Sequence, residues 1–183
     1  MEYTPIKTVF HSESLILRPV TPEDVTHTYV AWMNEPEVNK YMETRFREQT
    51  REAVESYVGT AIKNPDLHFF AILDPVSGKH IGNIKLAVNP HHRRGEISLF
   101  IGEKDFWGRG LATEAIKMIS DHGFNELRLR KITAGCYSNN KGSARAFEKA
   151  GFSREAVLSK EYLCSGRPVD RWCYCRFPGG NVQ

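Results

Sequence analysis

The chain has 183 residues, of which 40% are hydrophobic and 26% are charged, and its formal net charge is +3. This length predicts one domain over residues 1–183, with a core over about 14–177, and the composition excludes a disordered chain. The small positive charge suits an anionic small ligand and is too weak to indicate a nucleic-acid-binding protein. No stretch reaches the length of a membrane span.

The four cysteines, at positions 136, 164, 173 and 175, contain no CxxC spacing. The N-terminal residues lack the basic-then-apolar order of a signal peptide. We therefore expect buried free thiols in a reducing cytoplasm, with no bound metal. The last six residues, PGGNVQ (178–183), are expected to form a short frayed tail.

Hydrophobic periodicity and turn residues divide the chain into strands and helices. In chain order we expect a strand over 14–20, a helix over about 22–34, a helix after Thr50, strands over 68–74, 80–88 and 96–102, a helix over about 112–125, a strand over 131–137, a helix over 143–151 and strands near 152–163 and 169–177. This order, without repeats or linkers, predicts one mixed α/β (α+β) domain.

Capping residues set the ends of the first two helices. Thr21 and Pro22 provide an N-cap and a proline at the first helical position, and Pro36 ends the helix near Asn34. Thr50 is expected to cap the second helix, whose apolar face carries Val54, Tyr57, Val58 and Ile62.

The stretch DFWGRGLATEA (105–115) places two glycines, Gly108 and Gly110, before a helix. Unpaired N–H groups at a helix N-terminus attract anions, and glycine lets a ligand approach the backbone closely. Arg109 adds charge at the rim. The stretch lacks the lysine of a P-loop and the third glycine of a dinucleotide-binding loop. A phosphate cradle and a purely structural turn both remain open on this segment alone.

A second motif gives the loop its context. WGRGLATEA, which follows EISLFIG, and NNKGSARAFEKAGF (139–152) together resemble the GNAT family of acetyl-CoA-dependent N-acetyltransferases. LILRPVTPED and AWMNEPEV are similar to the opening strand and helix of its RimJ/RimL-like branch. The resemblance covers about residues 14–177. The family's loop motif matches at Gly110 and Ala112, with Trp107 in place of Gln or Arg, and its second motif matches at Asn140, Ser143, Lys149, Gly151 and Phe152.

The resemblance implies a fold and a co-substrate. The fold would be a twisted, mostly antiparallel sheet of about seven strands, splayed in the middle and flanked by about four helices. The co-substrate would be acetyl-CoA, with its pyrophosphate on backbone N–H groups of the loop and its pantetheine arm along the preceding strand. The implied cofactor-binding residues are Leu99, Phe100, Ile101, Trp107, Gly108, Arg109, Gly110, Leu111, Ala112, Thr113, Asn140 and Ser143.

Acetyl transfer requires a neutral amine and a leaving thiolate. Glu96, at the start of the strand that leads to the acetyl group, is the candidate general base, and the alternative is a surface glutamate beside Arg93 and Arg94. Phe147 stands where many family members have a tyrosine that protonates the sulfur. Ser143 or a water could supply that proton instead, and Tyr137 is a weaker candidate.

The acceptor site is expected around the first helices, with Trp32, Asn34, Tyr41 and Arg45 as its wall. The resemblance extends to enzymes that acetylate amino sugars, protein N-termini or spermidine. Basic residues in this region favour an anionic acceptor over a polyamine. The alternative of another class is a non-catalytic acyl-CoA-binding or sensing domain. The resemblance allows a homodimer, and neither a nucleic acid nor a membrane is an expected partner.

Overall fold

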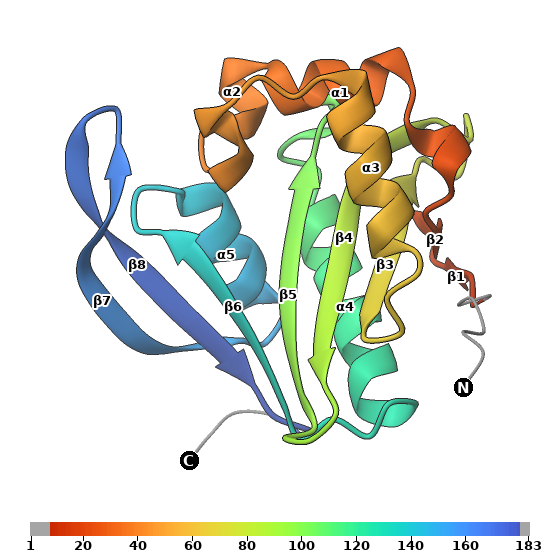
Figure 1. The fold of residues 1–183 in the computed structure, drawn as a ribbon. Coiled ribbons are helices and arrows are strands. Elements are labelled where there is room, and N and C mark those ends of the chain that lie inside the picture. Colours follow the sequence, from red (N-terminus) through yellow and green to blue (C-terminus); the bar gives the residue numbers. More distant parts are fainter. Residues whose placement is uncertain (1–7, 180–183) are drawn as a thin grey trace.

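One mixed sheet organises the molecule (Figure 1). The computed structural model describes residues 8–179, so residues 180–183 of the expected tail lie outside the described residues. The strands follow the order β1-β2-β3-β4-β5-β6-β8-β7, and every neighbouring pair is antiparallel except β5 and β6. Their bounds are β1 Phe10–His11, β2 Ile16–Pro19, β3 Leu67–Leu73, β4 His80–Asn89, β5 Arg94–Ile101, β6 Lys131–Tyr137, β7 Ser153–Cys164 and β8 Arg167–Arg176.

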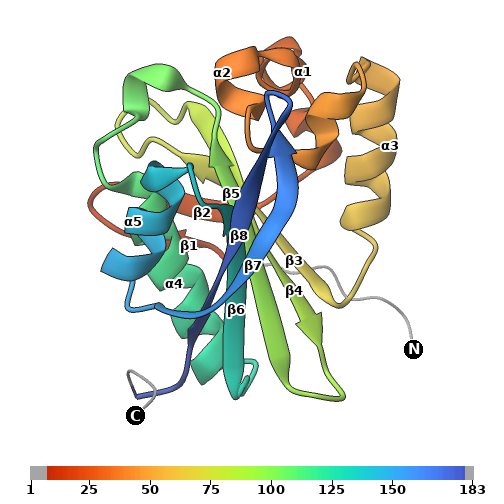
Figure 2. The same cartoon turned by 90° about the vertical axis from the view of Figure 1, so that its left-hand side faces the viewer.

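Helices cover both faces of this sheet. Figure 2 shows α4 and α5 on one face and α3 on the other, with α1 and α2 across the top. Within residues 8–179, no helix is long and apolar enough to cross a membrane. The helices are α1 His27–Asn34, α2 Pro36–Asn39, α3 Arg51–Ala61, α4 Leu111–Asn125 and α5 Lys141–Lys149, and short 3-10 turns cover η1 Pro22–Asp24, η2 Glu43–Phe46 and η3 Lys104–Phe106.

The expected fold class is confirmed, with small differences in the count of elements. The described chain has eight strands where about seven were expected, because the two-residue β1 adds to the edge of the sheet beside β2. It has five α-helices where about four were expected, because Pro36 starts the short helix α2 as well as following the end of α1. Proline suits the first helical position, where its missing N–H group costs nothing.

The start of the first helix was predicted wrongly. Residues 22–24 form a separate 3-10 turn, and α1 begins at His27 with Thr26 as its N-cap, whose hydroxyl accepts a hydrogen bond from the backbone N–H of Tyr29. Val25 has ψ 68°, which interrupts the helical path between the two elements. Thr50 caps α3 as predicted, since its hydroxyl accepts from the backbone N–H of Ala53.

Two hydrophobic clusters lie on opposite faces of the sheet. The first joins the sheet to α4 and α5 and includes Ile97, Ile116 and Phe147. The second joins it to α1 and α3 and includes Tyr29, Trp32 and Val58. Because side chains alternate along a strand, the residues of β5 divide between the two clusters. Side chains of β5 therefore contact both clusters, Ile97 in the first and Phe100 at the second.

A pair of buried histidines lies within the first cluster. His122 Nε2 of α4 lies 3.3 Å from His68 Nδ1 of β3, and the His122 ring packs against Phe10 and Phe70. Burial and the neighbouring His122 lower the pKa of His68 to about 4, and burial also lowers the pKa of His122. Both side chains are therefore neutral at pH 7, and a proton on either would face the other imidazole in an apolar surrounding.

The free energy of unfolding is expected to fall as the pH drops from about 6.5 to about 4. The unfolded chain protonates these histidines near their ordinary pKa, whereas the folded chain does so only at lower pH, so acid favours unfolding. Each histidine contributes a slope of up to about 1.4 kcal/mol per pH unit. Denaturant unfolding measured between pH 4 and 7.5 gives this slope directly.

His122→Phe is expected to flatten that slope, because it removes one titrating ring and keeps an aromatic side chain beside Phe10 and Phe70. The control is His27→Gln, which changes an exposed histidine of α1 and should leave the slope unchanged. If H122F and the wild-type chain showed the same dependence on pH, the acid sensitivity would come from other groups.

Candidate active site

Strands β5 and β6 diverge in the middle of the sheet. They pair only over Arg94–Ile97 and Lys131–Ala134, after which β5 continues beside β4 and β6 continues beside β8 (Figure 1). The divergence leaves one edge of β5, over residues 98–101, without a strand partner among the described residues. This is the edge expected to hold the pantetheine arm. At its end, the indole N–H of Trp107 donates to the carbonyl oxygen of Ile101 over 2.8 Å.

A cavity of about 490 Å³ opens where the strands diverge. Its lining combines residues that the sequence assigned to three different roles: Glu96 as base, Tyr41 from the acceptor wall, and Leu99, Phe100, Asn140 and Ser143 from the cofactor set. Ile101 and the loop residues 107–113 do not line it. The structure thus brings the expected catalytic, donor and acceptor residues to one space, with the loop outside it.

The loop before α4 presents unused backbone donors. Gly110 is the N-cap of α4 with φ 84°, and Gly108 has φ 74°, a left-handed conformation that L side chains rarely adopt. No residue in the described part of the chain accepts a hydrogen bond from the backbone N–H groups of residues 108–113. Arg109 is exposed and its guanidinium lies over the ring of Phe106. The geometry suits an anion at a helix N-terminus.

One expected donor of this loop is already engaged. The backbone N–H of Trp107 donates to the carbonyl oxygen of Lys104 over 3.0 Å, because residues 104–106 form the 3-10 turn η3. Trp107 therefore contributes its indole N–H to the loop's own structure and no free backbone N–H. The set of unused donors begins at Gly108.

Three of the four residues expected to form the acceptor wall lie outside the cavity lining. Trp32 is 6% exposed, packs in the second cluster and donates its indole N–H to Glu103 over 3.1 Å. Asn34 fastens the end of α1 to Gln49 by hydrogen bonds in both directions. Both side chains therefore make contacts within the fold instead of lining the cavity. Trp32 is held by a large apolar contact, and hydrophobic periodicity in the sequence does not distinguish a residue buried in this way from one that lines a binding face.

Arg45 lies outside the cavity lining and binds the backbone of two segments beside it. Its guanidinium donates to the carbonyl oxygens of Met42 and Leu163 and lies 5.1 Å from the centre of the Tyr137 ring. It thereby ties η2 to the β7–β8 hairpin. Tyr41 does line the cavity, and its hydroxyl donates to the carbonyl oxygen of Asn139.

Two lining residues that the sequence did not indicate, Glu43 and Tyr162, contact Tyr137, the weaker candidate for the proton donor. The Tyr137 hydroxyl donates to Glu43 Oε1 over 2.5 Å, and the Tyr137 ring stacks on Tyr162 with ring centres 4.1 Å apart. Burial and the Glu43 carboxylate raise the pKa of Tyr137 to about 12, so this hydroxyl is a poor acid. These residues come from η2, β6 and β7. Their meeting depends on the placement of the last hairpin, which no local pattern predicts.

Glu96 lies at the point of divergence. It is next to Ile97, the last residue of β5 that pairs with β6, and its side chain is 50% exposed. Glu96 Oε1 lies 3.6 Å from a guanidinium nitrogen of Arg171 in β8. The carboxylate therefore lies at the cavity with one cationic neighbour in the described part of the chain and no hydrogen bond to it. The alternative partners, Arg93 and Arg94, form no ion pair with Glu96 among the described residues.

The opposite side of the cavity is apolar around the departure from the family pattern. Phe147 is 1% exposed, lines the cavity and stacks on Tyr174. Asn140 is the N-cap of α5, because its side-chain oxygen accepts from the backbone N–H of Ser143. Burial raises the pKa of the neighbouring Cys136 thiol to about 11. All four cysteines are free thiols, and Cys136, Cys164 and Cys175 are buried.

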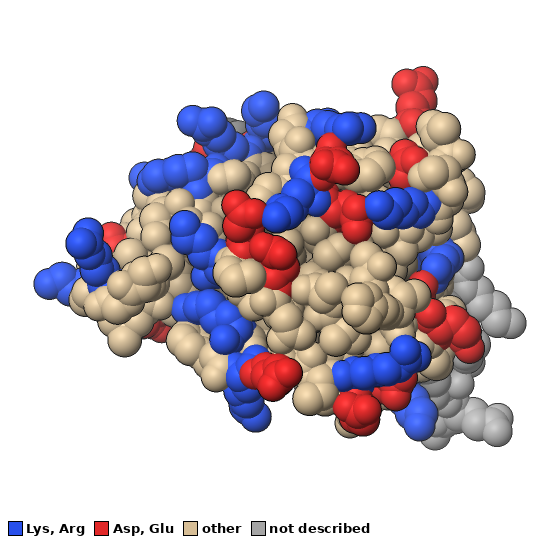
Figure 3. All heavy atoms as spheres, turned by 90° about the horizontal axis from the view of Figure 1, so that it is seen from above, with Lys and Arg blue, Asp and Glu red and all other residues tan. Residues whose placement is uncertain are grey.

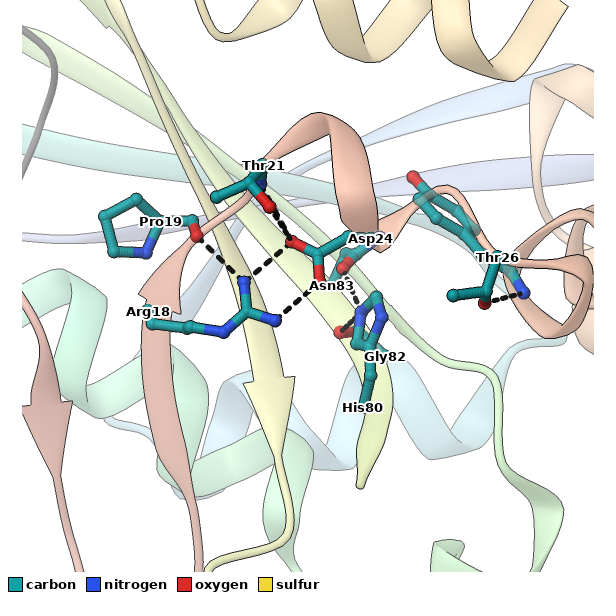
Figure 4. Close-up of polar contacts among 9 residues, drawn as sticks. Arg18, Pro19, Thr21, Asp24, Thr26, His80, Gly82 and Asn83 are labelled. Atoms are coloured by element: carbon teal, nitrogen blue, oxygen red, sulfur yellow. Dashed lines mark hydrogen bonds and ion pairs between the residues drawn. The ribbon is translucent and has the colours of Figure 1, made fainter. Parts of the chain in front are cut away.

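A polar network meets the cavity at Asn83 (Figure 4). Arg18 donates two hydrogen bonds to Asp24, at 2.7 and 2.5 Å. Burial opposes ionisation of Asp24, but its hydrogen bonds from Arg18 and Thr21 outweigh burial and keep the pKa of the carboxyl below its usual value. Beside it, His80 Nε2 contacts the Asn83 side-chain oxygen at 2.7 Å and the Gly82 carbonyl oxygen at 3.0 Å.

The network fixes the orientation of Asn83. His80 Nε2 contacts two oxygens, the Gly82 carbonyl and the Asn83 side-chain oxygen, so this nitrogen carries the proton and the Asn83 oxygen accepts a hydrogen bond from it. The amide nitrogen of Asn83, a residue that is 2% exposed and lines the cavity, then has no hydrogen-bond partner in the described structure. A buried donor without an acceptor costs about 1–3 kcal/mol, which a bound oxygen would recover.

Comparison with known proteins gives one consistent result. Residues 14–153 match the model of the acetyltransferase (GNAT) domain. The chain is 33% identical over 123 residues to YjcK of Bacillus subtilis, named as an N-acetyltransferase, covering 65% of this chain and 66%, just under two thirds, of that relative. It is 28% identical over 157 residues to the spermidine N(1)-acetyltransferase of Escherichia coli, covering 85% and 82% of the two chains.

A solved structure shares the fold. The spermidine N-acetyltransferase of Vibrio cholerae, determined in complex with CoA and spermine, superposes with a TM-score of 0.82 at 23% identity. The match covers 92% of this chain and 98% of that one.

Proposed function

The chain belongs to the GNAT acetyltransferase family and is an N-acetyltransferase, and from this premise we propose that it moves the acetyl group of acetyl-CoA directly onto a primary amine. The acceptor would be a small molecule, such as an amino sugar, or a protein N-terminus, as in the RimJ/RimL-like branch. The observation that carries the proposal is the cavity at the divergence of β5 and β6, which joins the donor and acceptor sides of the sheet.

The described residues fit coenzyme A as the carrier of the acetyl group. The unused backbone N–H groups of residues 108–113 suit its pyrophosphate, and a Cβ added at Gly108 or Gly110 would meet nothing within 4 Å, so the loop is open to a ligand. The unpaired edge of β5 suits the amides of the pantetheine arm. Asn140 and Ser143 lie on the other side of the same cavity.

The reaction requires loss of a proton from the acceptor. An alkyl ammonium with a pKa of about 10.4 is neutral in roughly one molecule in 10³ at pH 7. Glu96 would accept that proton, directly or through water, while the amine nitrogen bonds to the thioester carbon and the carbon–sulfur bond breaks. A thiol of pKa about 8.5 leaves tolerably as the thiolate, so Phe147 in place of a tyrosine is compatible with turnover. Ser143 is the candidate for a later proton donor.

A polyamine acceptor is the second candidate, because two of the similar proteins are spermidine acetyltransferases. The surface charge favours it less. Seen from above, basic and acidic side chains are interspersed over the face, with several basic ones toward the β7–β8 hairpin and a group of acidic ones near the middle (Figure 3). A continuous acidic surface would steer a polycation toward the cavity, and the mixed charges of this face do not form one.

Release of CoA thiol from acetyl-CoA is expected in the presence of at least one class of primary amine. A thiol-reactive dye follows the release across a panel of amino sugars, amino acids, N-terminal peptides and polyamines. Mass spectrometry of the acetylated amine confirms the transfer. If the protein bound CoA tightly and no amine in the panel were acetylated, the chain would be an acyl-CoA-binding domain and the proposal would fail.

A further inference from the structure

Among the residues that the structure describes, two with cationic side chains line the cavity, Lys85 and Arg171, and Lys85 donates a hydrogen bond to Tyr57. Arg171 lies on β8, opposite Tyr137 of β6, and it lines the cavity with a side chain that is 30% exposed. Its guanidinium lies across Gly135, where an added Cβ would come within 2.7 Å of the guanidinium Nε. Gly135 has no left-handed backbone angle, so this glycine serves to make room for the Arg171 side chain.

The donors of Arg171 are unused. Its anionic neighbour is Glu96, at 3.6 Å, a distance that allows an ion pair and is too long for a hydrogen bond. Among residues 8–179, none accepts a hydrogen bond from this guanidinium, and its Nε is buried without a partner. A guanidinium offers five N–H donors in a planar fork that matches a carboxylate or a phosphate.

The other charged residues that line the cavity already have partners. Glu43 is engaged by the Tyr137 hydroxyl and lies 3.7 Å from Arg45, and Lys85 donates to Tyr57. Each lining carboxylate therefore already faces a cation, which leaves no anionic site for the extra ammonium groups of a polyamine. Besides Arg171, the buried polar atoms of the lining that lack a partner are the Thr44 hydroxyl oxygen and the Asn83 amide nitrogen.

We propose that Arg171 binds an anionic group of the acceptor, so that the acceptor is a small molecule that carries both a primary amine and a carboxylate or phosphate. The inference rests on the proposed acetyltransferase function and names its substrate class. Arg171 would bind the acceptor's anionic group and Glu96 would accept the proton of its amine. Because these two side chains lie next to each other, the anionic group and the amine of the acceptor must be only a few bonds apart. An amino acid or an aminoalkyl phosphate meets this requirement, and spermidine does not.

The test compares acceptors that share an amine skeleton and differ in the anion, with kcat/KM expressed per neutral amine so that the different pKa values of the paired amines do not enter the comparison. Wild-type protein is assayed with glycine against glycinamide, with phosphoethanolamine against ethanolamine, and with spermidine. For the pair whose anion fits, kcat/KM is expected to favour the anionic member by about 10–100-fold, the range of a charge-assisted hydrogen bond. The two pairs distinguish a carboxylate from a phosphate.

Three variants assign the preference to Arg171. Arg171→Gln is expected to lower the ratio of the pair to near one, mainly through the KM of the anionic member, and kcat on the neutral amine reports separately any effect of the lost ion pair on Glu96. Because the ratio is compared between proteins, the different pKa values of the paired amines cancel. Arg171→Lys keeps the charge without the fork and should recover part of the ratio. Gly135→Ala displaces the guanidinium with Arg171 unchanged, and should lower the ratio as well.

Two results would overturn the inference and separate it from the proposed function. If the wild-type protein acetylated neutral amines or spermidine at least as well as the anionic members, or if R171Q kept the wild-type ratio, Arg171 would not recognise the acceptor, although the enzyme would still be an acetyltransferase. If acetyl-CoA bound and no amine of any arm were acetylated, the proposed function would fail together with the inference.

Discussion

Replacing Glu96 by glutamine is expected to lower kcat by about 10²–10⁴-fold near neutral pH, the usual contribution of a general base. Glutamine keeps the size of the side chain and cannot accept a proton. The carboxylate lies at the divergence of β5 and β6, lines the cavity and has Arg171 as its cationic neighbour. No other lining residue combines an available carboxylate with this position in the described structure, because Glu43 already accepts a hydrogen bond from the Tyr137 hydroxyl.

The dependence on pH distinguishes a base from a structural residue. The defect of E96Q should be largest at and below neutral pH and should shrink as the pH approaches the amine pKa of about 10.4, where the acceptor loses its proton unaided. Steady-state kinetics of both proteins from pH 6 to 10 measure this convergence. Glu43→Gln, another lining carboxylate, is the matched comparison and should cost much less. Parallel pH profiles for E96Q and wild type would exclude Glu96 as the base.

Substituting Gly110 by valine is expected to raise the KM for acetyl-CoA by about 10–100-fold, with a smaller change in kcat. The value corresponds to the loss of one charge-assisted hydrogen bond between the loop and the pyrophosphate. Gly110 has φ 84°, so a β-branched residue shifts the backbone that aims the unused N–H groups of residues 108–113. The loop contacts a part of the donor that does not react, which is why KM responds more than kcat.

Gly78→Val is the control for backbone strain. Gly78 has φ 69° in the turn between β3 and β4, and like Gly110 it has open space around an added Cβ. Both variants should lose a similar free energy of unfolding, about 1–2 kcal/mol. Only G110V should show a raised KM for acetyl-CoA. If both variants or neither raised it, the loop would be a structural turn and the cradle assignment would be wrong.

Local patterns in the sequence predicted most of the fold. The strand over 131–137, the cap of α3 at Thr50 and the end of α1 at Asn34 agree with the structure, because each depends on neighbouring residues. The start of α1 does not, because Asp24 is held by Arg18, which comes from a different element. Propensity favours a helix from Pro22, and a side-chain contact with the preceding strand β2 overrides it.

The residues of the candidate site also differ in whether neighbouring residues or long-range pairing reveals them. The loop and Asn140 belong to contiguous motifs and were named from the sequence, and Glu96 follows from its position on the strand before the loop. Arg171 and Gly135 could not be named, because their relation exists only across the β6–β8 pairing. Trp32 looked like part of a binding face, although the second cluster buries it. Long-range pairing, rather than local propensity, decides which side chains face the cavity.

The divergence of β5 and β6 has a consequence for how such a molecule could evolve. On the proposed function, main-chain groups of β5 and of residues 108–113 hold the donor, and they persist when side chains mutate. The acceptor meets side chains from separate elements, each of which one mutation can replace. Drift would therefore preserve the acetyl donor and change the acceptor. A lineage built on this sheet can acquire a new substrate through a single residue such as Gly135 and keep its chemistry.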